Sequence, residues 1–289
     1  MKVLVTGANG QLGYDVVRLA LQKGHEVFAA TRHELDITHL DETRRVISMQ
    51  MPEAVIHCAA YTAVDAAESD ADTAFRVNAY GTRNVALASE EVGARLVYVS
   101  TDYVFDGCAN QPYSEHHPTA PQSVYGKSKR AGEELAQMVC RRLMIARTAW
   151  VYGEHGNNFV RTMLQLGRTR EVVRVVDDQI GSPTYTRHLA AALLALSEQD
   201  VYGIYHLTGG GHCSWYDFAA EIFRLASLPA RLEPCSTIEF PRPAPRPAYS
   251  VLDNLALRVN GMPRLPAWQD GLRAYLQEIG EYKEGNVDV

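Results

Sequence analysis

The chain has 289 residues, and 28 Lys and Arg against 34 Asp and Glu give it a net charge of -6. This length suits one large α/β domain or two smaller ones, each with a substantial core. The charge balance shows no basic run that would bind nucleic acid, and no stretch approaches about eighteen apolar residues, so we expect neither a nucleic-acid partner nor a membrane span.

The five cysteines are odd in number, widely spaced and without a CxxC pair. This pattern predicts free thiols in a reducing compartment rather than a disulfide framework or a zinc site. The N-terminus has no basic-then-apolar leader, and we therefore expect a cytoplasmic protein.

In the first half of the chain, short apolar or β-branched runs recur between turn residues: KVLVTG, HEVFAAT, AVIHCAA, RLVYVS and RLMIART. Continuous apolar runs suit strands buried on both faces. Amphipathic segments lie between them, such as 11–23, whose apolar residues follow a helical spacing. The alternation predicts a doubly wound parallel sheet of the Rossmann type, which binds ligands beyond the carboxyl ends of its strands.

After residue 152 the alternation weakens, and YGEHGNNF and DDQIGSPTY are rich in turn residues. A helix is predicted at about 186–198, and GIYHLTGG indicates another strand. We expect a dinucleotide-binding domain at 1–152 with a returning segment at about 186–210, and a smaller substrate-binding cap at 153–185 and 211–289. The proline-rich FPRPAPRPAYS predicts a surface loop of the cap, with a PxxP ligand as the alternative.

The motif VTGANGQLG places Gly7, Gly10 and Gly13 after the first strand and at the start of the first helix. Glycines allow a tight turn and a close approach to a pyrophosphate, and free N–H groups at a helix start attract the anion. Gly10, Gln11 and Leu12 would then line the phosphates. A glycine-rich turn without a ligand is the alternative.

The second strand ends in AATRHELDIT, where Thr31 and Arg32 stand in place of the acidic residue that usually binds the ribose of NAD. Arg32 could pair with a 2′-phosphate, so NADP(H) is favoured and NAD(H) is the alternative. Asp36 could reach the adenine ring. The small residues Ala59 and Ala60, after AVIHC, would let a flat cofactor approach, although a close-packed strand end has the same pattern.

The run RLVYVSTDYVFDG puts a hydroxyl and a carboxyl group at the end of another buried strand, at Ser100, Thr101 and Asp102. Further on, Tyr125 and Lys129 have the i, i+4 spacing that places two side chains on one helix face. A nearby ammonium group favours the phenolate of a tyrosine, which can then exchange a proton with a carbonyl or hydroxyl oxygen. Tyr and Lys at this spacing also occur by chance, so the three motifs together carry the prediction.

TGANGQLG, STDYVF and YGKSK, in this order, resemble the extended short-chain dehydrogenase/reductases. GQLG, CAAYTAVDAAE, STDYVFDG, YGKSKRAGE, RTAWVYG, GNNFVRTM and DQIGSPTY are similar to the dTDP-4-dehydrorhamnose reductase family from residue 1 to about 275. The resemblance implies reduction of the C4 ketone of dTDP-4-dehydro-β-L-rhamnose by NAD(P)H, for polysaccharide biosynthesis, and suggests a homodimer.

The resemblance also implies roles for individual residues. Tyr125 is the proton donor, Thr101 polarises the carbonyl oxygen, and Lys129 holds the nicotinamide ribose. The expected cofactor-binding set is Gly7, Gly10, Gln11, Leu12, Gly13, Thr31, Arg32, Asp36, Ile37, Ala59, Ala60, Tyr61, Asn78, Ser100, Tyr125 and Lys129. The expected substrate-binding set is Thr101, Asp102, Tyr103, Tyr125 and Trp150.

Asn78 would support the cofactor side, and Asn158 and Arg246 are weaker candidates for the pyrophosphate of the nucleotide sugar. Trp150 follows a strand at the catalytic edge, where an aromatic face suits a sugar, although a packed core tryptophan is the alternative. Some relatives hold Mg²⁺ through glutamates, but Asp15 stands where one would be expected, and we predict no required metal.

Two other functions stay open. A nucleotide-sugar epimerase or dehydratase with tightly held NAD uses the same scaffold, although TDYVF lacks the Asp-Glu pair that elimination requires after Thr101. A non-catalytic relative is the second, because a similar fold binds NADP as the regulatory subunit of a methionine adenosyltransferase. The presence of Thr101, Tyr125 and Lys129 argues against it.

Overall fold

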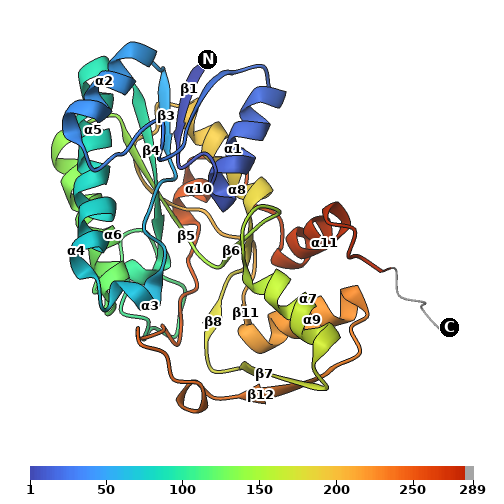
Figure 1. Cartoon of the computed structure of the whole chain (residues 1–289). Helices are drawn as coiled ribbons and strands as arrows, with labels where there is room; N and C mark the ends of the chain where they lie inside the picture. The colour runs from blue at the N-terminus through green and yellow to red at the C-terminus, as the bar shows by residue number, and fades with distance from the viewer. Residues whose placement is uncertain (284–289) are drawn as a thin grey trace.

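A six-stranded parallel sheet forms the centre of the chain in the computed structural model, which describes residues 1–283 (Figure 1). The last six residues of the expected cap, 284–289, lie outside the described residues. The strands follow the order β2-β1-β3-β4-β5-β10, and every neighbouring pair is parallel. Their bounds are β1 Lys2–Thr6, β2 Glu26–Ala30, β3 Ala54–His57, β4 Arg95–Thr101, β5 Leu143–Thr148 and β10 Gly203–His206.

Helices cover both faces of this sheet (Figure 1). One face packs against α1 (Gln11–Gln22) and α8 (Thr186–Ser197), and the other against α2 (Leu40–Gln50), α5 (Thr82–Val92) and α6 (Val124–Val139). Successive side chains of a strand point to opposite faces. On β1, for example, Val3 and Val5 join the core with α1 and α8, whereas Leu4 joins the core on the other side. The predicted doubly wound α/β fold is confirmed.

The remaining elements near the sheet are short. They are α3 Val64–Ala67, α4 Ala71–Phe75, the π-helical turn η1 Arg76–Gly81, the 3₁₀ turn η2 Asp102–Val104, and α10 Leu255–Val259, which packs against β10. The chain therefore returns twice to the sheet after residue 152, first through α8 and β10 and again through α10.

A second core lies at the carboxyl end of the sheet (Figure 1). Its apolar residues come from α7, α9 and α11 and from the strands between them, and include Phe218, Trp268 and Tyr275. These elements are β6 Val151–Tyr152, α7 Phe159–Thr169, β7 Val172–Val176, β8 Ile180–Gly181, β9 Thr184–Tyr185, β11 Cys213–Ser214, α9 Trp215–Ala226, β12 Arg231–Cys235, η3 Thr237–Glu239 and α11 Trp268–Glu278. Three two-stranded sheets join β6 to β9, β7 to β12 and β8 to β11.

Candidate active site

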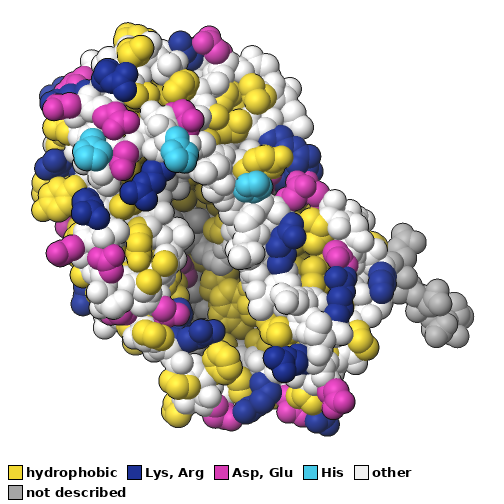
Figure 2. Space-filling view, in the orientation of Figure 1, with side chains coloured by type: hydrophobic (Ala, Val, Ile, Leu, Met, Phe, Trp, Pro, Cys, Tyr) yellow, Lys and Arg dark blue, Asp and Glu magenta, His cyan; other side chains and the backbone are white. Residues whose placement is uncertain are grey.

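A cavity of about 1090 Å³ runs along the carboxyl ends of the sheet and into the second core. Figure 2 shows the hollow between the two lobes, with hydrophobic side chains on its floor and basic side chains near its lower rim. Among the expected site residues, the cavity wall contains Gly7, Gly10, Gln11, Leu12, Gly13, Arg32, Asp36, Ile37, Ala59, Ala60, Tyr61, Ser100, Thr101, Asp102, Tyr103, Tyr125, Lys129 and Trp150. Thr31 and Asn78 are not part of the wall.

The glycine motif forms a cradle at one end of the cavity. Gly7 has a φ of +65°, and a Cβ there would lie 2.7 Å from the backbone nitrogen of Ala59. A Cβ on Gly13 would lie 2.8 Å from the carbonyl carbon of Gly7. Only glycine fits these positions, and the turn they form places the first N–H groups of α1 on the cavity wall. This arrangement fits the pyrophosphate of a dinucleotide.

The end of β2 supplies a basic side chain beside this cradle. Arg32 is exposed, and its Nε lies 3.6 Å from the Asp36 carboxylate. Asp36 also accepts hydrogen bonds from the backbone and hydroxyl of Thr38, and these bonds hold its pKa below the usual value despite partial burial. Thr31 instead bonds to Glu34. Arg32, although paired with Asp36, is 86% exposed and lies on the cavity wall, so of Thr31 and Arg32 it is the one that can reach a ligand.

Asn78 lies behind the wall and holds part of it in place. Its side chain is fully buried in η1, accepts a hydrogen bond from the Tyr61 backbone nitrogen at 2.8 Å and donates to the Tyr61 carbonyl at 3.0 Å. It also donates to Ser128 on α6. Asn78 thus fixes the segment after β3 against the helix that carries Tyr125.

The three expected catalytic residues meet in the cavity wall. Thr101 is the last residue of β4, and Tyr125 and Lys129 lie in the first turns of α6. Ser123 caps this helix by accepting a hydrogen bond from the backbone nitrogen of Gly126. The cap fixes where α6 begins, and so sets Tyr125 beside the end of β4.

The surroundings shift the pKa of two of these groups. Desolvation in the cleft raises the pKa of Tyr125 to about 12, with a hydrogen bond to Thr101 lowering it and the Asp102 charge raising it. Burial lowers the pKa of Lys129 to about 7, although the Glu133 carboxylate raises it. The Nζ atom of Lys129 donates to the Val99 carbonyl at 2.8 Å. Tyr125 therefore keeps its proton at neutral pH, whereas Lys129 titrates near neutral pH.

Asp102 and Tyr103 extend the wall beyond Thr101. Thr101 donates a hydrogen bond to Asp102 at 2.9 Å, and burial raises the pKa of this carboxyl group to about 6. The Tyr103 ring meets the Tyr125 ring edge to face, with centroids 5.6 Å apart. These contacts hold a carboxyl group and two phenols around the point where a reacting carbonyl would lie.

Trp150 lies on the wall of the same cavity and is held in an unusual conformation. Its φ of 48° belongs to the left-handed region, which a non-glycine residue rarely adopts. The Trp150 ring stacks on Trp215 of α9 at a centroid distance of 3.5 Å. One face of Trp150 is thus covered by protein, so a sugar would contact its other face or its edge.

Several wall residues lie outside the predicted set. Arg174, Gln179, Trp215, Phe240 and Arg242 reach the cavity from the second lobe, and Arg246, a weaker candidate above, pairs there with Asp65 at 2.9 Å. Arg174 and Trp215 come from segments without a recognised motif, whereas Gln179 lies within DQIGSPTY, and Phe240 and Arg242 lie within the proline-rich FPRPAPRPAYS. Asn158 is not on the wall, because its side chain caps α7 and bonds to Gln11.

Within residues 1–283, no helix is both long and apolar enough to cross a membrane. The same residues contain no group of three His, Cys, Asp or Glu side chains that could hold a metal ion. Asp15 is buried, accepts a hydrogen bond from Thr186 and has a raised pKa through desolvation.

The glycine cradle follows β1, and Thr101, Tyr125 and Lys129 line the same cavity at the carboxyl edge of the sheet. This combination defines a dinucleotide-binding protein of the extended short-chain dehydrogenase/reductase class. The sequence matches the family described as "RmlD substrate binding domain" over residues 1–281, and the chain belongs to that family. The resemblance drawn from the motifs is confirmed.

Individual relatives are similar over nearly their whole length. The spore coat polysaccharide biosynthesis protein SpsK of Bacillus subtilis is 46% identical over 277 residues, which cover 96% of this chain and 97% of that protein. The dTDP-4-dehydrorhamnose reductase of Streptomyces griseus is 44% identical over 276 residues, with coverage of 93% and 91%. A crystal structure of dTDP-4-dehydrorhamnose reductase from Bacillus anthracis in complex with NADP matches with a TM-score of 0.94 at 44% identity, covering 96% of this chain and 99% of that one.

Proposed function

We propose that this chain reduces the C4 ketone of dTDP-4-dehydro-β-L-rhamnose to dTDP-β-L-rhamnose, with NADPH favoured over NADH. The observation that carries the proposal is the position of Thr101, Tyr125 and Lys129 on the wall of one cavity whose other end is the glycine cradle. The names of the relatives, including an NADP complex, support the substrate and the cofactor. SpsK supports a role in polysaccharide biosynthesis.

The cradle of Gly7, Gly10 and Gly13 would hold the pyrophosphate, and Arg32 the 2′-phosphate. When bound, NADPH supplies the hydride for the ketone carbon. Ala59, Ala60 and Tyr61 line the neighbouring wall. Residues 1–152 and 186–210 would hold the cofactor, and 153–185 with 211–283 the nucleotide sugar, except for α10, which packs against β10.

Tyr125 is the proton donor in this reaction. Its pKa of about 12 keeps the phenol protonated at neutral pH, and the alkoxide that forms at C4 is a stronger base than a phenolate. The ammonium group of Lys129, one helical turn away, stabilises the phenolate that remains.

Thr101 polarises the ketone oxygen. Its hydroxyl has one proton, which the structure directs to Asp102, so the hydroxyl turns toward the substrate oxygen when it acts. Asp102, Tyr103 and Trp150, which line the same cavity as Tyr125, would then hold the sugar.

The location and assembly of the enzyme belong to the proposal. We infer a cytoplasmic enzyme, since all five cysteines are unpaired. A homodimer is expected by analogy with the family.

The test is to mix purified protein with NADPH and dTDP-4-dehydrorhamnose and follow NADPH absorbance. Wild type consumes NADPH, and Tyr125→Phe loses about 10²- to 10⁴-fold in kcat while still binding NADPH. An epimerase would convert the sugar without net NADPH consumption, and a regulatory subunit would bind NADPH without turnover. Either result, or equal rates for wild type and Tyr125→Phe, contradicts the proposal.

A further inference from the structure

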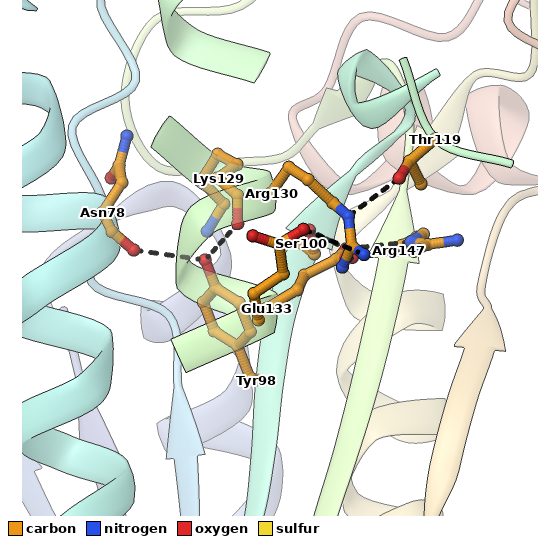
Figure 3. Close-up of polar contacts among 9 residues, drawn as sticks. Asn78, Tyr98, Ser100, Thr119, Lys129, Arg130, Glu133 and Arg147 are labelled. Atoms are coloured by element: carbon orange, nitrogen blue, oxygen red, sulfur yellow. Dashed lines mark hydrogen bonds and ion pairs between the residues drawn. The ribbon is translucent and has the colours of Figure 1, made fainter. Parts of the chain in front are cut away.

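A buried carboxylate on α6 bonds to side chains of the neighbouring strands β4 and β5 (Figure 3). Glu133 accepts two hydrogen bonds from Arg147 on β5, from Nε at 2.8 Å and from Nη2 at 2.7 Å. It accepts a third from the Ser100 hydroxyl on β4, at 2.7 Å. Glu133 is 0% exposed and Arg147 is 1% exposed, so the pair is removed from water.

Ser100 was expected among the cofactor-binding residues, and its hydroxyl is committed to this carboxylate. The residue lies on the cavity wall, one position before Thr101, but its hydroxyl proton points away from the cavity to Glu133. Arg130 adds a fourth contact to Glu133 at 3.2 Å and is itself fixed by Thr119 (Figure 3). The carboxylate is therefore held rigidly by groups from three segments.

Glu133 follows Lys129 by one turn of α6, which places both side chains on one face of the helix. Lys129 is 2% exposed, donates to the Val99 carbonyl, and its Nζ lies 4.2 Å from the centre of the Tyr98 ring. The Tyr98 hydroxyl lies 3.5 Å from the carbonyl oxygens of Asn78 and Lys129. An ammonium group in such a place needs an opposite charge, because burial disfavours its charged form.

The other titratable groups around Lys129 supply no such charge at neutral pH. Burial lowers the pKa of His57 to about 3 and raises that of Cys58 to about 12. The pKa of Tyr98 is raised well above its usual value by burial, and that of Tyr125 to about 12. Of these neighbours from β3, β4 and α6, Glu133 is the one that brings a negative charge.

We propose that Glu133 is a positioning residue for the reaction: its carboxylate, fixed by Arg147 and Ser100, favours the charged form of Lys129 inside the protein. The role of Glu133 in catalysis rests on the proposed function, because that function assigns Lys129 to the stabilisation of the Tyr125 phenolate. The electrostatic coupling itself does not depend on the substrate.

A purely structural role is a weaker explanation of this network. A buried ion pair can often be replaced by apolar side chains with no loss of stability, since desolvation of two charges offsets their attraction. The carboxylate lies one helical turn from Lys129, and its second oxygen is fixed by two arginines. Stabilisation of the Lys129 charge explains why a carboxylate stands here, whereas packing alone does not require one.

The test measures the pKa of Lys129 directly. The chain has five lysines, Lys2, Lys23, Lys127, Lys129 and Lys283, so ¹³C labelling at lysine Cε gives few NMR signals, and Lys129→Met assigns the buried one. We expect wild type to titrate near 7, and Glu133→Gln to move this pKa down by about one unit. Glu134→Gln removes the same charge at the neighbouring, half-exposed position, and we expect it to leave the Lys129 pKa unchanged.

Glu133→Gln leaves Arg147 without its partner, so a paired variant guards against loss of folding. Glu133→Gln with Arg147→Met removes both charges and is also expected to lower the Lys129 pKa. Arg147→Met alone removes the positive charge that neutralises the Glu133 carboxylate, and is expected to raise the Lys129 pKa. Shifts of opposite sign are not produced by a structural defect.

An unchanged Lys129 pKa in folded Glu133→Gln, in the folded double variant or in folded Arg147→Met overturns the inference. If only Arg147→Met folds, the absence of an upward shift does so. In the enzyme assay, the upper limb of the pH profile of kcat should move down in pH with Glu133→Gln and stay in place with Glu134→Gln. NADPH oxidation by wild type tests the proposed function separately, so the two can fail independently.

Discussion

One added methyl group beside the Trp150 ring is expected to lower the activity strongly. In Gly181→Ala, the new Cβ would lie 2.5 Å from Nε1 of Trp150 and 2.7 Å from its Cζ2, whereas ordinary contact begins at 3.4 Å. Because Cε2 of the ring would be closer still, the ring must move by about 1 Å to restore ordinary contact. Trp215 stacks on Trp150 at 3.5 Å and restricts the directions open to this movement.

A shift of about 1 Å in a positioning group can cost about 10²-fold in rate, and overpacking costs about 1–3 kcal/mol of stability. We expect kcat/KM for the nucleotide sugar to fall by about 10- to 100-fold, with the Kd for NADPH unchanged because the cradle is remote from Gly181. Gly210→Ala is the matched control, since its Cβ would meet Ala267 at an ordinary 3.4 Å. Equal kinetics for Gly181→Ala and Gly210→Ala would refute the assignment of Trp150 to the sugar.

Three further predictions concern the carboxyl group, the cofactor and the cradle. Burial raises the pKa of Asp102 from 3.8 to about 6, so the folded protein binds this proton more tightly and loses stability as pH rises through that window. Asp102→Asn should therefore raise the free energy of unfolding by on the order of 1–3 kcal/mol at neutral pH and have no such benefit below pH 3.8, as measured by urea denaturation, while lowering kcat. Arg32→Ala should weaken the affinity for NADPH about tenfold or more and leave the affinity for NADH unchanged, as measured by titration calorimetry. An equal loss of affinity for both cofactors would contradict a 2′-phosphate contact. Gly13→Ala, with its Cβ 2.8 Å from the Gly7 carbonyl carbon, should abolish cofactor binding, and tight NADPH binding by a folded Gly13→Ala variant would argue against the cradle.

The sheet and the catalytic residues could be predicted because their patterns are local. Apolar runs such as KVLVTG specify strands buried on both faces, and β1, β3, β4 and β5 lie where these runs occur. The predicted helices at 11–23 and 186–198 correspond to α1 and α8. Parallel strands end at one edge, so a motif after each strand is enough to bring Gly7, Thr101 and Tyr125 to one cavity.

The rest of the site depends on contacts between distant segments. Trp150, Trp215 and Gly181 come from three segments that are distant in the sequence and meet in the fold. No local sequence pattern shows that one face of the Trp150 ring is covered. The side chain of Ser100 turns to Glu133, although its position at the strand end suggested the cofactor. Asn158 looked like a ligand residue but serves as a helix cap.

The most direct test of the central claim is to follow the transferred hydrogen. NADPH carrying deuterium at the reactive nicotinamide position is incubated with the protein and dTDP-4-dehydrorhamnose, and the sugar product is examined by mass spectrometry and NMR. We expect one deuterium per sugar, bonded to C4, and far slower formation of this deuterated product when Tyr125→Phe replaces wild type. A product formed without deuterium at C4, or deuterium transfer at the same rate by Tyr125→Phe, would contradict this claim.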